Sequence, residues 1–445
     1  MALTRSIYSQ FEAWKEAPRH GALLVAGARQ VGKTFLIRQF ARENYEVLLE
    51  INFVETPSAK SIFEGDLDAE TLIANLTAFS GTALKPGGTL VFLDEVQECP
   101  KARTAIKFLV DDGRFDYIES GSLLGVLSGE VPSLPVGYEQ MLRMHPLSLT
   151  EFFLENGVQQ ETLDLVRRCC EEGRPVPTVA HKRLMRLFRL YLAVGGMPAA
   201  VQEFVETSDL ARVLRVQRDI VGMYRQDIAK YAADKAHVHM IFDALPAELD
   251  KKNKRFKLSD LAKSARMERY ASDFMWLVDA GVALPCYNAV APQAPLAVNA
   301  RHNLFKLFLC DVGLLSAASV GAVQFDLVQG DVSVNWGSFL ENALAQELAV
   351  NGFDLFYYDK SKIGEVDFLI QKGSRVIPLE AKSGVDYAKH VALDNLMAVG
   401  EWQLGEAMVL CRGNVERCGR ITYLPWYAAA FLKQDALPER FIVEA

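Results

Sequence analysis

The sequence has no long hydrophobic run, few cysteines and little excess charge. It contains no stretch of about 18 apolar residues, and Met1–Arg5 does not lead into the apolar core of a signal peptide. The seven cysteines form no Cys-x-x-Cys pair, which is typical of reduced thiols rather than of disulfides or zinc. The net charge is −8, so the surface as a whole does not suit a polyanion. These absences predict a cytoplasmic protein with no membrane partner.

What is present is a globular composition in a long chain. Of the 445 residues, 50% are apolar and 23% are charged. A chain of this length has room for two or three domains with their own cores.

One glycine-rich segment has the spacing of a phosphate-binding loop. It reads Gly-x-x-x-x-Gly-Lys-Thr and lies between an apolar run at 22–26 and a helical pattern at 35–40. Backbone N–H groups at the helix start would bind phosphate, Lys33 would reach the β- and γ-phosphates, and Thr34 would hold Mg²⁺. The residues expected to bind nucleotide here are Gly27, Ala28, Arg29, Gln30, Val31, Gly32, Lys33 and Thr34.

Two later strands would supply the other polar groups of such a site. Residues 89–93 are apolar and end in Asp94 and Glu95, which would hold Mg²⁺ and polarise the attacking water. An acidic pair at this point favours hydrolysis over simple nucleotide binding, although two exposed acids can also close a strand. Ser120 or Ser122, at the end of a third strand, would contact the γ-phosphate or position water; Ser-Gly-Ser is also ordinary turn chemistry.

Together these motifs resemble a group of bacterial and archaeal AAA-plus ATPases with a C-terminal domain of unknown function. The resemblance implies ATP and Mg²⁺ as cofactors. Many relatives have Gly-Arg where this chain has Gly137-Tyr138, so no role of that arginine carries over, and Arg143 is a substitute only by position. Further matching segments are 144–152, Tyr191–Pro198, Phe305–Leu315 and Phe339–Lys382.

We expect an α/β fold with four parts. Residues 1–155 would form a P-loop, AAA-plus-like ATPase core with a parallel sheet, and residues 156–235 a helical lid or linker. Residues 236–315 would form a winged helix-turn-helix, and residues 316–445 a restriction-endonuclease-like α/β domain. Arg225 is a candidate for an arginine offered to a neighbouring subunit of a homo-oligomer, or it belongs to a solvated helix face.

The winged helix-turn-helix is expected from three helical patterns and two strands. The helices would cover 239–249, a segment beginning at Leu258 with Ser259 as its cap, and 270–280. The strands would cover 282–288 and 303–310. Such a module places its third helix in DNA, or serves only as a lid or packing module, and Asp273 and Asp279 count against DNA.

A basic run precedes and overlaps this module. Between Lys251 and Arg269 there are eight basic and two acidic residues. This local excess predicts contact with phosphate groups of DNA, and the sequence does not separate DNA from RNA. The expected nucleic-acid contacts are Lys251, Lys252, Lys254, Arg255, Lys257, Arg266 and Arg269.

The C-terminal part holds a second set of acids. Glu341 lies on an amphipathic helix, Asp367 on a strand at 365–370, and Glu380 and Lys382 on a strand at 375–382. These four residues resemble the active site of PD-(D/E)xK nucleases, with Val366 in place of the familiar proline. The resemblance implies that all four are catalytic and that Asp367 and Glu380 bind metal. Alternatively, these residues are solvated positions at strand ends, or the domain is retained as a binding module without catalysis. Glu365 would be an extra metal ligand only if its strand twists at that point.

Two functions remain open on the sequence. In the first, ATP hydrolysis is coupled to DNA binding or processing by the nuclease-like domain. In the second, the protein is a nucleotide-controlled switch whose C-terminal domain does not cut and binds a protein partner.

Overall fold

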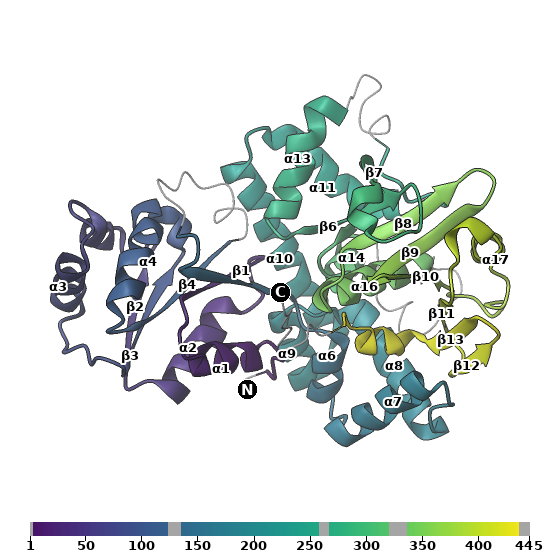
Figure 1. Cartoon of the computed structure of the whole chain (residues 1–445), viewed down its shortest axis with the longest axis horizontal. Coiled ribbons are helices and arrows are strands. Elements are labelled where there is room, and N and C mark those ends of the chain that lie inside the picture. Colours follow the sequence, from purple (N-terminus) through teal and green to yellow (C-terminus); the bar gives the residue numbers. More distant parts are fainter. Residues whose placement is uncertain (1–2, 123–134, 258–266, 320–335, 436–445) are drawn as a thin grey trace, which may run out of the picture. The chain divides into compact units, whose positions relative to one another are not determined.

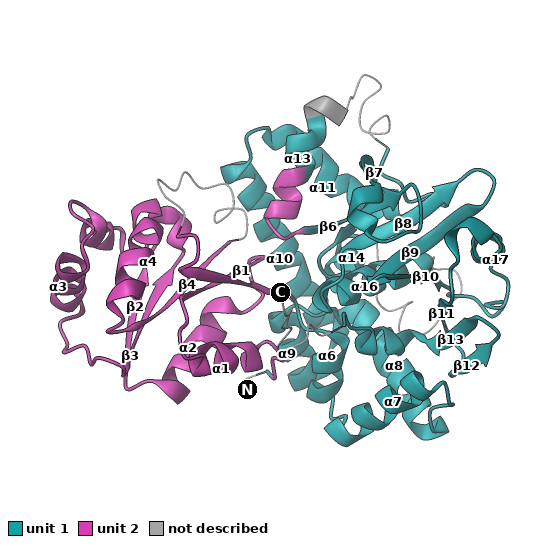
Figure 2. Ribbon diagram, in the orientation of Figure 1, with its two compact units in different colours: residues 1–3, 146–274, 283–445 teal, residues 4–145, 275–282 magenta. Residues whose placement is uncertain are grey.

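The computed structural model describes residues 3–122, 135–257, 267–319 and 336–435. The chain forms two compact units, coloured separately in Figure 2. The N-terminal unit comprises residues 4–145 and 275–282, and the C-terminal unit comprises residues 1–3, 146–274 and 283–445. Residues 146–155, which we expected in the ATPase core, fall in the C-terminal unit in this division, and the expected domain boundary at residue 155 stays a prediction. Within the described ranges, no helix has both the length and the apolar composition needed to cross a membrane.

The N-terminal unit is built on a five-stranded sheet in which all neighbours are parallel, with the order β2-β3-β4-β1-β5 (Figure 1). All six residues of β1 and of β3 are buried, which explains their continuous apolar sequences. The strands are β1 Ala22–Gly27, β2 Val47–Asn52, β3 Thr89–Asp94, β4 Asp116–Ser122 and β5 Glu139–Met144. The helices are α1 Tyr8–Glu16, α2 Lys33–Asn44, α3 Ala69–Ser80 and α4 Pro100–Asp112, with short 3₁₀ turns at Pro57–Phe63 and Val96–Glu98.

Alternate residues of the strands divide between the two faces of this sheet. Leu24, Ile51 and Leu93 share a buried cluster with Leu72 of α3 and Leu109 of α4. On α2 and α1, the ring of Phe40 contacts the rings of Phe11 and Trp14 in a separate buried group. The parallel arrangement places the carboxyl ends of all five strands at one edge of the sheet.

The C-terminal unit is built on an eight-stranded mixed sheet with the order β12-β13-β11-β10-β9-β8-β6-β7. Its strands are β6 Ala283–Ala289, β7 Ala300–Leu309, β8 Leu355–Lys360, β9 Gly364–Lys372, β10 Arg375–Ala381, β11 Ala407–Cys411, β12 Glu416–Cys418 and β13 Ile421–Pro425. Its helices are α6 Leu149–Glu155, α7 Gln160–Glu172, α8 Thr178–Val194, α9 Pro198–Thr207, α10 Leu210–Tyr231, α11 Lys235–Asp250, α13 Met267–Asp279, α14 Val312–Ala318, α16 Trp336–Val350 and α17 Val391–Met397. Short 3₁₀ turns lie at Leu296–Asn299, Gly400–Trp402 and Trp426–Phe431. Helix α13 is shared, because its residues from Met275 onward belong to the N-terminal unit.

The two strands expected to form a wing continue this sheet. β6 and β7 pair with each other, and β6 also pairs in parallel with β8. The first and third expected helices are present as α11 and α13, whereas the second, with Ser259, lies outside the described residues. The winged helix-turn-helix therefore stays a prediction.

A buried polar network joins segments that are far apart in the sequence. The hydroxyl of Tyr191 on α8 donates to the carbonyl of Leu147 at 2.7 Å and accepts from Gln346 of α16 at 2.8 Å. The backbone N–H of Gly196 donates to Asp311, 2.5 Å away. A Cβ on Gly196 would come within 2.2 Å of the Leu147 carbonyl oxygen, so glycine is required there. The segments that carry the family resemblance are therefore hydrogen-bonded to one another in the interior of the C-terminal unit.

Candidate nucleotide site and carboxylate cluster

The glycine-rich loop connects β1 to α2, as expected. Gly32 has φ +94° and immediately precedes Lys33, the first residue of α2, so the loop ends on a helix N-terminus. The Lys33 ammonium is 3.0 Å from the carbonyl oxygens of Gly27 and of Ala28. Burial lowers the pKa of Lys33 to about 8, although the nearby Glu95 and Asp94 carboxylates act in the opposite direction. The lysine is therefore folded back over the loop that would receive phosphate.

The other loop residues differ in exposure. Ala28 and Val31 are buried, Arg29 is half-buried and Gln30 is exposed with φ +67°. Sequence analysis did not single out Arg5, whose guanidinium donates to the carbonyl of Val31 at 2.8 Å. Its other terminal nitrogen donates to the carbonyl of His145 at 2.6 Å, so Arg5 ties the loop to the chain after β5.

Four polar side chains meet at the carboxyl ends of the strands. Asp94 accepts hydrogen bonds from Thr34 at 3.3 Å, from Asn52 at 3.0 Å and from the hydroxyl of Ser120. Burial raises the pKa of Asp94, and the bonds from Ser120 and Thr34 act against that rise. Ser122 is the last residue of β4. Sequence analysis missed Asn52, which is the last residue of β2 and lies opposite Asp94 in the register.

The acid after Asp94 has an unusual backbone. Glu95 has φ +54°, a left-handed conformation that is uncommon for residues other than glycine. Its carboxylate accepts a hydrogen bond from Gln97. The oxygen donors of Thr34 and Asp94 fit a Mg²⁺ ion whose other ligands are phosphate oxygens and water.

The segment after α13 contacts the loop from another part of the sequence. Gly281 has φ +72°, and a Cβ there would lie 3.0 Å from the backbone nitrogen of Ala28. Burial raises the pKa of Asp279, which the positive charge of Arg143 partly offsets. Arg143 itself is exposed on β5. The candidate trans-acting residue Arg225 pairs with Asp243, with 2.8 Å between nitrogen and oxygen, so that role stays a prediction.

In the C-terminal unit, the structure brings together Asp367 of β9, Glu380 of β10 and Lys382, the residue after β10. Asp367 accepts the backbone N–H of Ala381 at 2.8 Å, and the Lys382 ammonium lies 2.7 Å from Glu380. Burial raises the pKa of Glu380, with Lys382 acting against it. Burial also raises the pKa of Asp367 well above its usual value, and the negative charges of Glu341 and Glu380 add to the rise.

Glu341 joins this group together with two lysines. One carboxylate oxygen lies 2.5 Å from Lys254 and the other 3.5 Å from Lys306. Burial opposes the charge of Glu341, but Lys306 and Lys254 more than offset it and lower its pKa. Lys306, on β7, also lies 2.6 Å from Glu365. We call Glu341, Glu365, Asp367, Glu380, Lys254, Lys306 and Lys382 the carboxylate cluster.

The carboxylate cluster does not fit a divalent metal as it stands. Among the described residues, no group of three or more His, Cys, Asp or Glu side chains is arranged to hold a metal ion. The ammonium of Lys306 lies among the acids that would have to serve as ligands. The predicted metal roles of Asp367 and Glu380 therefore have no support in this geometry.

The basic run is only partly available to a partner. Lys252 and Lys257 are exposed, and Arg255 is half-buried. Lys251 pairs with Glu248, and Lys254 is committed to Glu341. Arg266 and the side chain of Arg269 lie outside the described residues.

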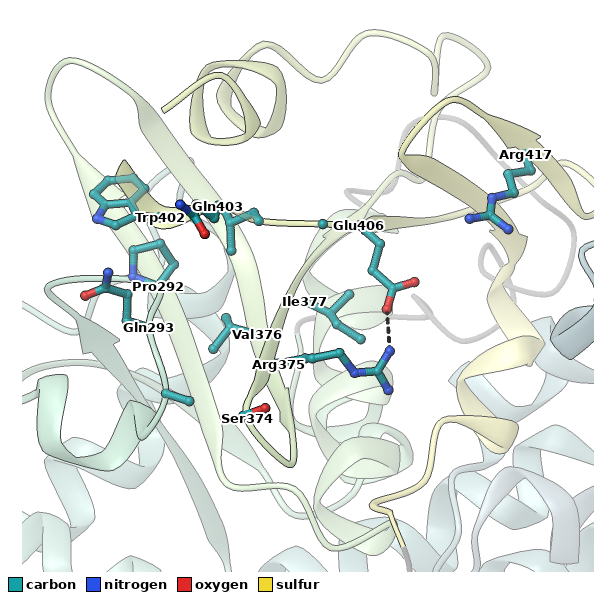
Figure 3. A pocket seen from close by; sticks show the side chains of 13 residues that line it. Pro292, Gln293, Ser374, Arg375, Val376, Ile377, Trp402, Gln403, Glu406 and Arg417 are labelled. Carbon is teal, nitrogen blue, oxygen red and sulfur yellow. Dashed lines mark hydrogen bonds and ion pairs between the residues drawn. The ribbon is translucent and has the colours of Figure 1, made fainter. Parts of the chain in front are cut away.

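A hollow of about 690 Å³ opens beside β10 (Figure 3). Its lining includes Trp402, Arg417 and the ion pair of Arg375 and Glu406, whose closest atoms are 3.3 Å apart. None of the residues predicted from the sequence lines it.

Comparison with protein families gives three matches. Residues 19–153 match an AAA domain. Residues 185–324 and 336–428 match two domains of unknown function, DUF8612 and DUF4143. The N-terminal unit thus carries an AAA-type P-loop domain, which supports an ATP-binding protein of that type. The two other matches give no support for a nuclease.

The chain is also similar to solved structures, at low identity. The Walker-type ATPase PABY2304 of Pyrococcus abyssi is 16% identical with a TM-score of 0.42, over 71% of this chain and 96% of that one. The Aeropyrum pernix Orc1 protein in complex with DNA is 12% identical with a TM-score of 0.30, over 74% and 93%. Thermotoga maritima RuvB, as the T158V variant, is 16% identical with a TM-score of 0.31, over 66% and 91%. A search of curated proteins found no match.

Proposed function

We propose that the chain binds ATP with Mg²⁺ and hydrolyses it in the N-terminal unit. The observation that carries this proposal is that Thr34, Asn52 and Ser120 all donate hydrogen bonds to Asp94. Thr34 directly follows Lys33 at the start of α2. A site that only binds nucleotide needs no more than the phosphate-binding loop and its lysine. Polar groups gathered on a second strand end are what a hydrolytic site adds.

Each residue has a defined task in this proposal. Lys33 exchanges the carbonyls of Gly27 and Ala28 for phosphate oxygens, which keeps its ammonium charged. Thr34 and Asp94 hold Mg²⁺, which neutralises charge on the phosphates when bound. Glu95 takes a proton from the attacking water. Ser120, already hydrogen-bonded to Asp94, keeps that carboxylate oriented.

We further propose that nucleotide state controls the C-terminal unit, as in a switch. The supporting observation is Gly281, which touches the loop at Ala28 and lies two residues before β6. β6 is hydrogen-bonded to β8 within the sheet that carries the carboxylate cluster. A movement of the phosphate-binding loop would therefore displace the segment at Gly281, which continues directly into β6.

DNA is the second candidate for the partner of the C-terminal unit. The exposed Lys252 and Lys257 favour it, because both ammonium groups are free to meet phosphates. A protein partner is the alternative, and a homo-oligomer is compatible with either. Cutting of DNA would need a metal that the carboxylate cluster does not fit.

The test is ATP turnover and nucleotide binding by the full-length protein, with and without double-stranded DNA. Lys33→Ala removes the phosphate contact and is expected to abolish binding of a fluorescent ATP analogue. Glu95→Gln is expected to keep binding and to lower turnover by ~100-fold or more, the usual effect of losing a general base. Lys101→Ala, at an exposed lysine of α4, is the matched control.

Three outcomes separate the proposals. Turnover that persists in both Lys33→Ala and Glu95→Gln contradicts ATP hydrolysis at this site. Stimulation by DNA that is lost in Lys252→Ala with Lys257→Ala supports DNA as partner. Turnover indifferent to DNA favours a switch with a protein partner.

A further inference from the structure

The carboxylate cluster contains a buried ammonium that sequence analysis did not anticipate. Lys306 has 0% exposure, and no water can reach its charge directly. Its nitrogen lies 2.6 Å from Glu365 and 3.5 Å from Glu341, on two different elements. A lysine is buried in this way only when carboxylates compensate the loss of water.

Three of the four acids in the cluster already have an ammonium partner without a metal. Glu341 and Glu365 contribute two negative charges, and Lys254 and Lys306 contribute two positive charges. Asp367 is half-buried beside Glu341 and Glu380 and accepts the backbone N–H of Ala381. Glu380 has its own partner in Lys382. A divalent cation placed among these acids would meet an ammonium with no route to solvent.

The ammonium comes from outside the C-terminal family match. Lys306 lies on β7, within the segment 185–324, whereas the four acids lie within 336–428. β7 reaches the cluster because it pairs with β6, and β6 with β8. The sequence of the C-terminal match alone therefore shows the four acids and Lys382, but neither Lys306 nor Lys254.

We propose that Lys306 is the resident cation of the carboxylate cluster, and that replacing it with an uncharged side chain turns the cluster into a divalent-cation site. Glu341, Glu365 and Asp367 would then be the ligands. Their carboxylate oxygens are the hard donors that Mg²⁺ and Mn²⁺ prefer. In the natural protein the cluster fastens β7, α16 and β9 to one another and binds no metal.

The experiment is a Mn²⁺ titration of the nucleotide-free, full-length protein, followed by the electron paramagnetic resonance signal of free Mn²⁺. Lys306→Met keeps an unbranched side chain of nearly the same length, without the ammonium and its charge. We expect it to gain about one Mn²⁺ per chain over the natural protein, and the additional Asp367→Asn to remove that gain. Lys360→Met is the matched control, because the Lys360 ammonium lies over the rings of Tyr358 and Trp402 and not among the acids.

A second comparison decides the matter even if Lys306→Met does not fold. The natural protein and Asp367→Asn are expected to bind the same amount of Mn²⁺, because Asp367 holds none. Mn²⁺ bound by the natural protein and lost in Asp367→Asn would overturn the proposal. So would a folded Lys306→Met protein, shown by its circular dichroism, that gains no Mn²⁺.

Discussion

Asn52 donates a hydrogen bond to Asp94, with 3.0 Å between its Nδ2 and the carboxylate Oδ2. The two residues are the last of β2 and β3 and lie opposite each other in the parallel register. Asn52 also accepts the backbone N–H groups of Val54 and Glu55, so its amide is fixed from both sides. This places an uncharged donor on the carboxylate assigned to Mg²⁺.

We expect Asn52→Ala to lower ATP turnover by ~10-fold, because one hydrogen bond to a charged group is worth roughly 1.5–3 kcal/mol and part of it is replaced by water. Asn52→Asp keeps the backbone contacts but sets a second carboxylate against Asp94, and should lower turnover further. Steady-state turnover at saturating ATP measures both. Asn75→Ala, which removes an amide that donates to the Ile62 carbonyl, is the control; equal turnover in all three variants would refute the role of Asn52.

Nucleotide affinity should depend on pH through Lys33. Its pKa is lowered to about 8 mainly by burial, so the ammonium is charged below about pH 8 and loses its proton as pH rises through that value. Phosphate favours the charged form, so binding above about pH 8 takes up a proton and the Kd rises by up to ~10-fold per pH unit. Calorimetry with ADP in buffers of different ionisation heat measures this proton uptake.

Lys33→Arg is the control for that titration, since arginine stays charged throughout the range. Whatever affinity this variant retains should vary little with pH. The same Kd for the natural protein at about pH 7 and about pH 9 would contradict the assignment.

A side chain at Gly281 should weaken nucleotide binding, because it would press against the phosphate-binding loop at Ala28. Alanine there would have φ +72° and a Cβ 3.0 Å from the Ala28 nitrogen. Gly81, at the end of α3, has φ +64° with nothing within 4 Å of its Cβ position, so Gly81→Ala carries the same backbone strain without the contact. We expect Gly281→Ala to weaken ATP binding by ~3- to 10-fold, corresponding to roughly 1 kcal/mol of displacement at the loop.

Binding of a fluorescent ATP analogue measures the difference between these two variants. Both are expected to lose some thermal stability from the positive φ. Equal nucleotide affinities of Gly281→Ala and Gly81→Ala would show that the segment after α13 does not affect the phosphate-binding loop.

The stability of the C-terminal unit should fall with rising pH through Glu347. This buried acid accepts the N–H of Leu149 at 2.9 Å, and burial raises its pKa to about 7 from 4.5. Because the folded pKa is the higher one, the stabilising contribution is complete below about pH 4.5 and is lost as pH rises through about 7. Glu347→Gln keeps an acceptor for Leu149 and removes the titration.

The measurement is the thermal midpoint of the natural protein and of Glu347→Gln at about pH 6 and about pH 8. The natural protein should lose more of its midpoint between these values than the variant does. Glu416→Gln, at an exposed acid of β12, should behave like the natural protein. A parallel fall in all three would assign the pH dependence to other groups.

Most parts of the candidate nucleotide site can be recognised in the sequence, because each part is local in sequence. A phosphate-binding loop is one continuous segment, and an acid after a buried apolar run marks a strand end wherever the strand lies. Asn52 could not be found in this way, since β2 is amphipathic and its neighbour in the sheet depends on strand order. Knowledge that β2 lies beside β3 would have been enough to single it out.

The C-terminal unit shows the limits of local patterns more clearly. Asp367, Glu380 and Lys382 come together because the first two lie on consecutive antiparallel strands and Lys382 directly follows the second strand. Lys254 was expected to face nucleic acid because of the charges around it, yet its own side chain is only 11% exposed and pairs with Glu341. Lys306 carries no local signal, since it is a lone lysine in the apolar end of β7 and its acidic partners, Glu341 and Glu365, lie more than 30 residues further along the chain.

The eight-stranded sheet crosses the border between the two C-terminal family matches, with β6 and β7 on one side and β8 to β13 on the other. A fragment that began at residue 336 would leave β8 as a bare edge, with backbone donors and acceptors open to any passing strand. It would also separate Glu341 and Glu365 from Lys306. Such a fragment would be prone to self-association and would carry a charge pattern that the intact chain never presents. The structural unit in this half of the protein is therefore the whole sheet.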